Sequence, residues 1–216
     1  MRFIFTLVLL IASTMLFAQQ ASYTFVFLNS KKDKKELPQE EVKKIMEGHM
    51  ANINRLAKEG KLLAAGPFEG GGGMFIFKTT SVDTAANWLS TDPGVQAQRW
   101  NVEILPYQPR TGGVCPVGEN YEMINYHFVR FTAQVTKSTA VNYPDILRRH
   151  DEYIKEKFSK TGNVITEGIF GNDGGILILK GEFQKEIVEN DPGVQEALLQ
   201  LDIKKLFIAK GSFCEK

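Results

Sequence analysis

The sequence contains few of the residues on which metal and redox sites depend. Its 216 residues include only two cysteines and three histidines. Neither cysteine belongs to a CxxC pair, and no group of His, Cys and carboxylate residues has the spacing of metal ligands. We therefore predict no metal site. No cofactor is expected either, because the glycine run Gly70–Gly73 lacks the Lys and Ser/Thr of a phosphate-binding loop and precedes a strand pattern.

An excess of charge of either sign is also absent. Lys and Arg number 26 against 25 Asp and Glu, which gives a formal net charge of +1. The densest charge cluster, Lys31–Glu36, lies between a strand pattern and a helix pattern and is typical of a solvated loop. A near-neutral chain without a basic block is a poor partner for nucleic acid or an anionic membrane, so we predict neither.

Long apolar runs are confined to the amino terminus. Arg2 is followed by the mostly apolar segment Phe3–Phe17 and by the small residue Ala18. The run is shorter than the roughly 20 residues of a membrane-spanning helix and is typical of a secretory signal peptide. We predict a signal peptide over residues 1–18, cleavage near Ala18 and export to the periplasm or the medium. An uncleaved N-terminal anchor is the alternative.

The two cysteines, Cys115 and Cys214, follow the last predicted strands of two similar halves of the chain. An exported protein can keep a disulfide. The spacing does not decide whether the two sulfur atoms meet, so a bridge and two buried thiols both remain open.

An internal repeat organises the rest of the sequence. The pentapeptide DPGVQ occurs at Asp92–Gln96 and again at Asp191–Gln195. Other landmarks occur in the same order in both halves, with slippage of one or two residues: the strand patterns Tyr23–Leu28 and Tyr126–Phe131, His49 and His150, Gly60 and Gly162, Gly66 and Gly168, and the pairs Gly72-Gly73 and Gly174-Gly175. The period is too long for a solenoid and indicates two tandem domains.

Hydrophobic periodicity predicts the same elements in each half. In the first half we expect strands at 23–28, 62–65, 74–78 and 102–105, and helices at 38–59 and 83–89. In the second half we expect strands at 126–131, 164–167, 175–179 and 205–209, and helices at 146–158 and 182–189. The order βαββαβ is that of a ferredoxin-like unit of the α+β class.

A ferredoxin-like sheet has helices on one face and an open apolar face on the other. The simplest cover for each open face is the sheet of the other copy, which predicts an intrachain pseudo-dimer packed sheet to sheet. We place the repeats at 22–108 and 121–212, joined by a Gly- and Pro-rich linker at 109–120. Further self-assembly stays open.

Two histidines and two aspartates are the candidate functional residues. His49 and His150 each lie within the apolar stripe of the first helix of a repeat, where an imidazole can be a core residue or a general acid or base. Asp92 and Asp191 each precede a proline, which is typical of a helix N-cap. Each carboxylate could also orient the imidazole of its repeat.

These landmarks resemble the YCII-related (YciI-like) domain family. The first copy carries the pattern as His49, LLAAGP at Leu62–Pro67, Gly72-Gly73 and Asp92-Pro93. The second copy carries it as His150, Gly168, Gly174-Gly175 and Asp191-Pro192.

The resemblance implies a dimeric α/β-barrel fold and a His/Asp catalytic centre, with His49 and Asp92 in one copy and His150 and Asp191 in the other. It also implies a ligand pocket bordered by Gly66, Pro67, Gly72 and Gly73. Related dehydrochlorinase and muconolactone isomerase proteins act on small ring or diene acids.

The chain departs from the family in two respects: it lacks the Arg that often precedes the histidine, and its second copy matches the pattern less well. An Arg often precedes the family histidine by three residues, whereas Met46 and Leu147 stand there, and Ile169 replaces Pro67 in copy two. We therefore expect the pocket in copy one and a structural role for copy two. The expected chemistry is isomerisation or elimination on a small organic acid. The alternative is a non-catalytic small-molecule-binding or interaction module whose histidines are structural.

Overall fold

The computed structural model describes residues 23–118, 120–158 and 161–215. The predicted signal peptide lies outside the described residues. Within the described part, no helix is both long enough and apolar enough to cross a membrane.

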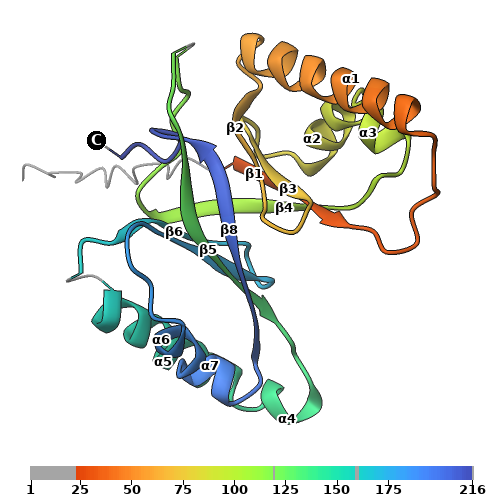
Figure 1. The fold of residues 1–216 in the computed structure, drawn as a ribbon. Coiled ribbons are helices and arrows are strands. Elements are labelled where there is room, and N and C mark those ends of the chain that lie inside the picture. Colours follow the sequence, from red (N-terminus) through yellow and green to blue (C-terminus); the bar gives the residue numbers. More distant parts are fainter. Residues whose placement is uncertain (1–22, 119, 159–160, 216) are drawn as a thin grey trace, which may run out of the picture.

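Each repeat contains four strands and two principal helices in the predicted order (Figure 1). The elements of the first repeat are β1 (Tyr23–Ser30), α1 (Gln39–Lys58), β2 (Leu62–Pro67), β3 (Gly73–Phe77), α2 (Val82–Leu89), α3 (Pro93–Gln96) and β4 (Trp100–Thr111). Those of the second are β5 (Met123–Ala133), α4 (Lys137–Ala140), α5 (Tyr143–Phe158), β6 (Val164–Ile169), β7 (Gly174–Leu179), α6 (Lys185–Glu189), α7 (Pro192–Gln195) and β8 (Leu199–Ala209).

Local sequence signals account for the element ends. Helix α1 is followed by Gly60, whose φ of 67° lies in the left-handed region that glycine adopts without strain. The Ser81 side chain caps α2 by accepting a hydrogen bond from the Thr84 amide. The four-residue helices α3 and α7 both begin with Pro-Gly directly after a capping aspartate.

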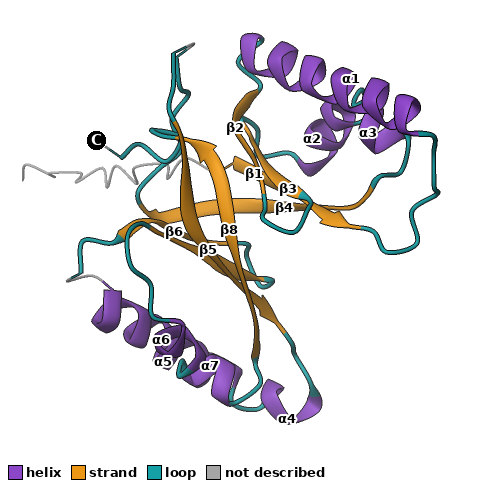
Figure 2. Cartoon of the chain, viewed as in Figure 1, coloured by secondary structure: helices purple, strands orange, loops and turns teal. Residues whose placement is uncertain are grey.

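The eight strands form one sheet in the order β2-β3-β1-β4-β6-β7-β5-β8. The two edges of this sheet approach each other, because Phe68 forms a bridge with Leu206 and the Glu69 amide donates to the Lys205 carbonyl at 2.9 Å. The sheet therefore curves into a barrel (Figure 2). The helices of the two repeats lie on opposite outer sides of the barrel, as the predicted pairing of two ferredoxin-like units requires.

The last strands of the repeats are longer than hydrophobic periodicity predicted. Strand β4 continues to Thr111, through three residues that the sequence placed in the linker, because its end pairs with β6 of the other repeat. Strand β8 begins at Leu199 rather than Lys205, because all of β5 pairs with it. Pairing partners in the other repeat or at the far end of the chain are invisible in a short sequence window.

Along each strand, alternate side chains pack into two different hydrophobic cores. In β1, Phe25 and Phe27 face the barrel interior, whereas Val26 and Leu28 face helices α1 and α2. The barrel interior is shared by both repeats and filled by side chains, many of them aromatic. A second helix-facing core lies in the second repeat. Any hollow next to His49 or His150 therefore has to lie between helix and sheet, on the outside of the barrel.

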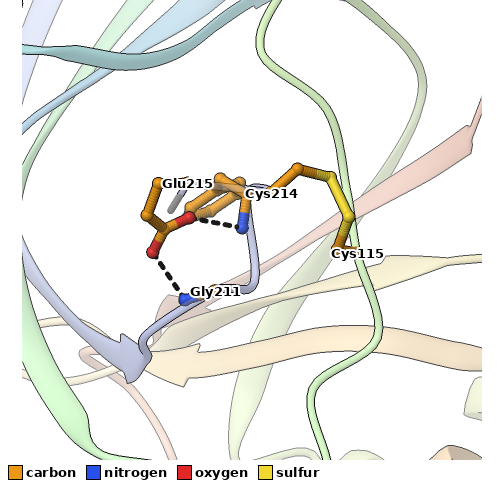
Figure 3. The surroundings of a disulfide bond; sticks show 5 residues. Cys115, Gly211, Cys214 and Glu215 are labelled. Atoms are coloured by element: carbon orange, nitrogen blue, oxygen red, sulfur yellow. Dashed lines mark hydrogen bonds between the residues drawn. A yellow bond between two sulfur atoms is a disulfide. The ribbon is translucent and has the colours of Figure 1, made fainter.

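A disulfide joins Cys115, just after β4, to Cys214 near the carboxyl end of the chain (Figure 3). The Cys115 amide also donates to the Ser212 carbonyl at 2.9 Å. The carboxylate of Glu215 accepts hydrogen bonds from the Gly211 and Phe213 amides. Because the Phe213 ring is buried in the barrel core, the bridge fixes a C-terminal segment that closes part of that core.

Candidate functional site

In the first repeat, helix α1 brings His49 against Asp92. Nδ1 of His49 lies 2.8 and 3.0 Å from the two Asp92 carboxylate oxygens. The carboxylate is fully buried and also accepts hydrogen bonds from the Asn52 side chain and from the Gly94 and Val95 amides. Asp92 thus caps α3 and ties this short helix to α1 at the same time.

These partners keep Asp92 ionised. Burial opposes the charged form, but hydrogen bonds from His49, Asn52 and the Val95 amide outweigh it, so the pKa of the Asp92 carboxyl lies below its usual value. A carboxylate only accepts hydrogen bonds, so Nδ1 of His49 carries the proton and donates it. Nε2 is left as the basic nitrogen of the ring.

The second repeat contains an equivalent pair, whose carboxylate accepts fewer hydrogen bonds. Nδ1 of His150 lies 2.8 Å from the buried Asp191 carboxylate, which also accepts from the Gly193 and Val194 amides. Tyr153 stands at the position equivalent to Asn52 and donates to the Ile187 carbonyl instead. Both predicted pairings of histidine with aspartate are therefore present in the structure.

The two histidines differ in what packs against them. In the first repeat, the rings of Trp100 and Phe75 lie against His49, with centroid distances of 4.9 and 5.8 Å. The equivalent positions of the second repeat hold Leu199 and Leu177, at the start of β8 and within β7. At these two positions aromatic rings are replaced by smaller side chains, while the Phe131 ring lies against His150 with a centroid distance of 4.9 Å.

A cavity of about 170 Å³ occupies the space beside His150. It lies between α5 and the sheet, and its lining includes His150, Leu177 and Leu199 together with Phe131, Tyr143, Leu147 and Ile154. His49 does not line it. This cavity lies in copy two, for which we expected a structural role.

The glycines predicted to border a pocket in the first repeat lie where the backbones of neighbouring strands approach closely. A Cβ atom on Gly66 would lie 2.6 Å from the Phe207 carbonyl oxygen, and one on Gly72 would lie 2.2 Å from the Leu28 carbonyl oxygen. Gly73 similarly faces the Gly66 backbone, and Pro67 pairs with it across β2 and β3. All four positions have a packing role here, where strands approach closely.

Their counterparts in the second repeat do line the cavity. Gly168 and Ile169 correspond to Gly66 and Pro67, and Gly174 and Gly175 correspond to Gly72 and Gly73; all four second-repeat residues border the hollow next to His150.

A three-residue charge cluster stands at the edge of the cavity. Arg110, from the end of β4, donates from Nε to Glu167 at 2.8 Å and from Nη2 to Asp151 at 2.8 Å, and Nη2 also contacts Glu167. These carboxylates hold the pKa of the Arg110 guanidinium above its already high value, although burial opposes this. The same three residues line an adjoining cavity of about 490 Å³.

Sequence reasoning did not identify this cluster. Arg110 was placed in the linker, and only the pairing of β4 with β6 brings it to the second repeat. Asp151 could have been suspected, because it directly follows His150. The difference between Trp100 and Leu199 was also visible in the sequence, because each lies eight residues after the aspartate of its DPGVQ motif.

Among the described residues, no group of three or more His, Cys, Asp or Glu side chains is placed to hold a metal ion. The chemistry that the described site can support is therefore that of an oriented imidazole, three carboxylates and one guanidinium around an apolar hollow.

Comparisons with known proteins agree with this architecture. Residues 24–108 match the model of the YCII-related domain, so the first repeat is a YCII-related domain. No curated protein matches the chain.

Several solved structures share the fold of the whole chain at low sequence identity. A candidate chlorite dismutase is 7% identical, with 88% of this chain and 96% of that chain covered and a TM-score of 0.51. A mutant chlorite dismutase from Candidatus Nitrospira defluvii in complex with cyanide is 10% identical, with coverages of 87% and 91% and a TM-score of 0.51. A heme-binding protein from Thermus thermophilus is 11% identical, with coverages of 88% and 91% and a TM-score of 0.48. The likeness to the two chlorite dismutase structures shows a shared dimeric α/β-barrel fold.

Proposed function

We propose that this chain, whose first repeat is a YCII-related domain, binds a small organic molecule beside His150 and transfers a proton on it. The observation that carries the proposal is that His150 borders a cavity while its Nδ1 is held by the buried Asp191 carboxylate. A carboxylate at Nδ1 fixes the ring orientation and leaves Nε2 as the nitrogen that can accept a proton. Isomerisation and elimination on a small organic acid are the reaction classes that a single acid/base pair serves.

The size of the cavity limits the ligand. Its volume of about 170 Å³ is close to the roughly 150 Å³ of an apolar cavity that admits benzene. A single ring or a short branched chain fits, and the apolar side chains in the lining, such as Leu177 and Leu199, favour such a body. One of the compared proteins is described as heme-binding, but a macrocycle exceeds the volume of this cavity.

Proton exchange tests the catalytic proposal without knowledge of the product. Small ring carboxylic acids would be incubated with the protein in D2O, and loss of C–H signals would be followed by proton NMR. We expect exchange with the native chain and with His49→Ala, and none with His150→Ala. Equal exchange by all three proteins, or by none of them, would exclude His150 as the base.

A second function is favoured by the first repeat. There the same pair lies beneath Trp100 and Phe75, and Asp92 caps α3, so a His/Asp pair can serve purely as a tie between two helices. On this view the protein is a non-catalytic binding module. It would retain ligand binding in His150→Ala and show no exchange with any acid.

We also propose that the protein is exported. The disulfide between Cys115 and Cys214 supports this, because disulfides persist in oxidising compartments. The mass of the mature chain from culture medium or periplasm tests the proposal, with Gln19 as the expected first residue. An intact Met1 in a cytoplasmic fraction would contradict it.

A further inference from the structure

We propose that Arg110 is a specificity-determining residue of the second-repeat site, and that it selects ligands with a carboxylate by exchanging Asp151 for the ligand. The inference rests on the proposed function, because it concerns the same cavity. It starts from an asymmetry in how the two carboxylates hold the guanidinium.

Glu167 holds one edge of the guanidinium firmly. It accepts hydrogen bonds from Nε and Nη2, and its side chain is only 14% exposed. Both contacts are to Oε1 of Glu167, and hydrogen bonds between charged groups are stronger than neutral ones. Glu167 is therefore the positioning residue that fixes Arg110 at the boundary of the cavity.

Asp151 occupies the other edge loosely. It accepts from Nη2 alone, and its side chain is 48% exposed. Within the described part of the chain, Nη1 donates no hydrogen bond. Of the two nitrogens on the Nη1–Nη2 edge of the guanidinium, only Nη2 therefore donates, and this edge is half used. Exposed ion pairs contribute about 0–1 kcal/mol, so water can replace Arg110 as the partner of Asp151 at little cost.

A ligand carboxylate matches the half-used edge. It would accept from Nη1 and Nη2 together, in the two-bond geometry that Arg favours and Lys does not. The body of the ligand would then lie in the apolar cavity, which Arg110, Asp151 and His150 all border. The site beside His150 is in this way completed by a residue of the first repeat.

The proposal predicts that removing the charge of Arg110 and removing the charge of Asp151 have opposite effects on the binding of a carboxylate ligand. Arg110→Gln removes the attraction, whereas Asp151→Asn removes a competitor and a repelling charge. If the cluster instead attracted a cationic ligand, Asp151→Asn would weaken binding. The sign of the Asp151→Asn effect therefore identifies the charge of the ligand.

Three one-ring probes test this by calorimetry on the full-length mature chain: benzoate, its neutral analogue benzamide and the cation benzylamine. We expect the native protein to prefer benzoate. Arg110→Gln should weaken benzoate binding by about tenfold and leave benzamide unchanged. Arg110→Lys should recover only part of the loss, and Asp151→Asn should tighten benzoate binding about two- to fivefold.

The possible outcomes separate this inference from the proposed function. Equal binding of benzoate and benzamide, with no effect of Arg110→Gln, would overturn the role of Arg110 and leave the cavity as a ligand site. Weaker binding in Asp151→Asn would likewise overturn it. Failure of all three probes to bind the native protein would contradict both the role of Arg110 and the site. Circular dichroism of each variant would verify the fold.

Discussion

Trp100 lies against His49 with ring centroids 4.9 Å apart, and its counterpart Leu199 lines the cavity beside His150. The two repeats share their His/Asp geometry, because the imidazole nitrogen lies 2.8 Å from a carboxylate oxygen in each. What differs is the size of the side chain at the start of the last strand. An indole ring thus lies against the first histidine, whereas a leucine that lines a cavity stands at the equivalent position beside the second.

Leu199→Trp should close the second-repeat cavity. The first repeat shows that this backbone tolerates an indole beside a histidine and next to a glycine, since Trp100 packs against Gly94 as Leu199 packs against Gly193. We expect benzoate binding to disappear while the thermal midpoint changes little. Calorimetry and thermal unfolding would check this, and unaltered binding would place the ligand elsewhere.

Trp100→Leu should create a cavity beside His49. Loss of a half-buried ring that is not refilled should lower the free energy of unfolding by about 1–3 kcal/mol. An apolar ligand that enters the new cavity stabilises the folded state by mass action. We therefore expect benzene to raise the thermal midpoint of the variant more than that of the native chain. An equal response of both proteins would show that the site collapses instead.

The repeat and its hydrophobic periods were enough to predict two ferredoxin-like units and their pairing. DPGVQ placed Asp92 and Asp191 in register, and helical spacing turned His49 and His150 toward the sheet, so both pairings could be anticipated. Each of these inferences depends on residues within one repeat. The local residue pattern and the internal repeat were therefore enough to predict the two units and their His/Asp pairs.

The cavity and its charges could not be predicted in the same way. A hollow depends on the summed volume of side chains that several strands bring together, of which Trp100 and Leu199 are one pair. Arg110 reaches the site only because β4 pairs with β6 across the repeat boundary. The disulfide stayed open for a similar reason, since it needs the ends of two distant segments to meet.

The stability of the chain should fall in acid partly through Asp92. Its folded-state pKa lies below the unfolded value of about 3.9, so its contribution is complete above that pH and is lost as the pH falls toward the folded-state pKa. Asp92→Asn should therefore be less stable at pH 7 and show a shallower loss of stability below pH 4. Urea unfolding across pH would measure this, with the exposed Glu36→Gln as control. Parallel pH profiles for native and Asp92→Asn proteins would contradict the prediction.

The disulfide should make a large contribution to stability. It closes a loop with a sequence separation of 99 residues, for which the chain-entropy model gives up to about 4.7 kcal/mol. A Cys115→Ser/Cys214→Ser double variant should lose several kcal/mol of unfolding free energy. A reducing agent should destabilise the native chain and leave the double variant unchanged. If the reductant had no effect on the native chain, the bridge would not be formed in solution.

Arg130 and Glu103 form an ion pair across the barrel interior that should stabilise the joining of the repeats. Nη1 and Nη2 of Arg130 donate to the two Glu103 carboxylate oxygens at 2.8 and 2.7 Å, and the guanidinium lies 3.9 Å from the Phe27 ring centroid. Arg130 is only 9% exposed, so Glu103→Gln should leave a buried charge poorly paired and cost about 2–3 kcal/mol.

The pseudo-symmetric position supplies a matched control for this pair. Asp202 corresponds to Glu103, but its partner Lys204 is more exposed, so Asp202→Asn should cost less than about 1 kcal/mol. Replacing both members of the interior pair, as Glu103→Leu with Arg130→Met, should restore much of the loss, because apolar residues leave no charge to desolvate. Denaturant unfolding of these variants would measure the differences. An equal cost for Glu103→Gln and Asp202→Asn would show that the less exposed pair contributes no more than the more exposed one.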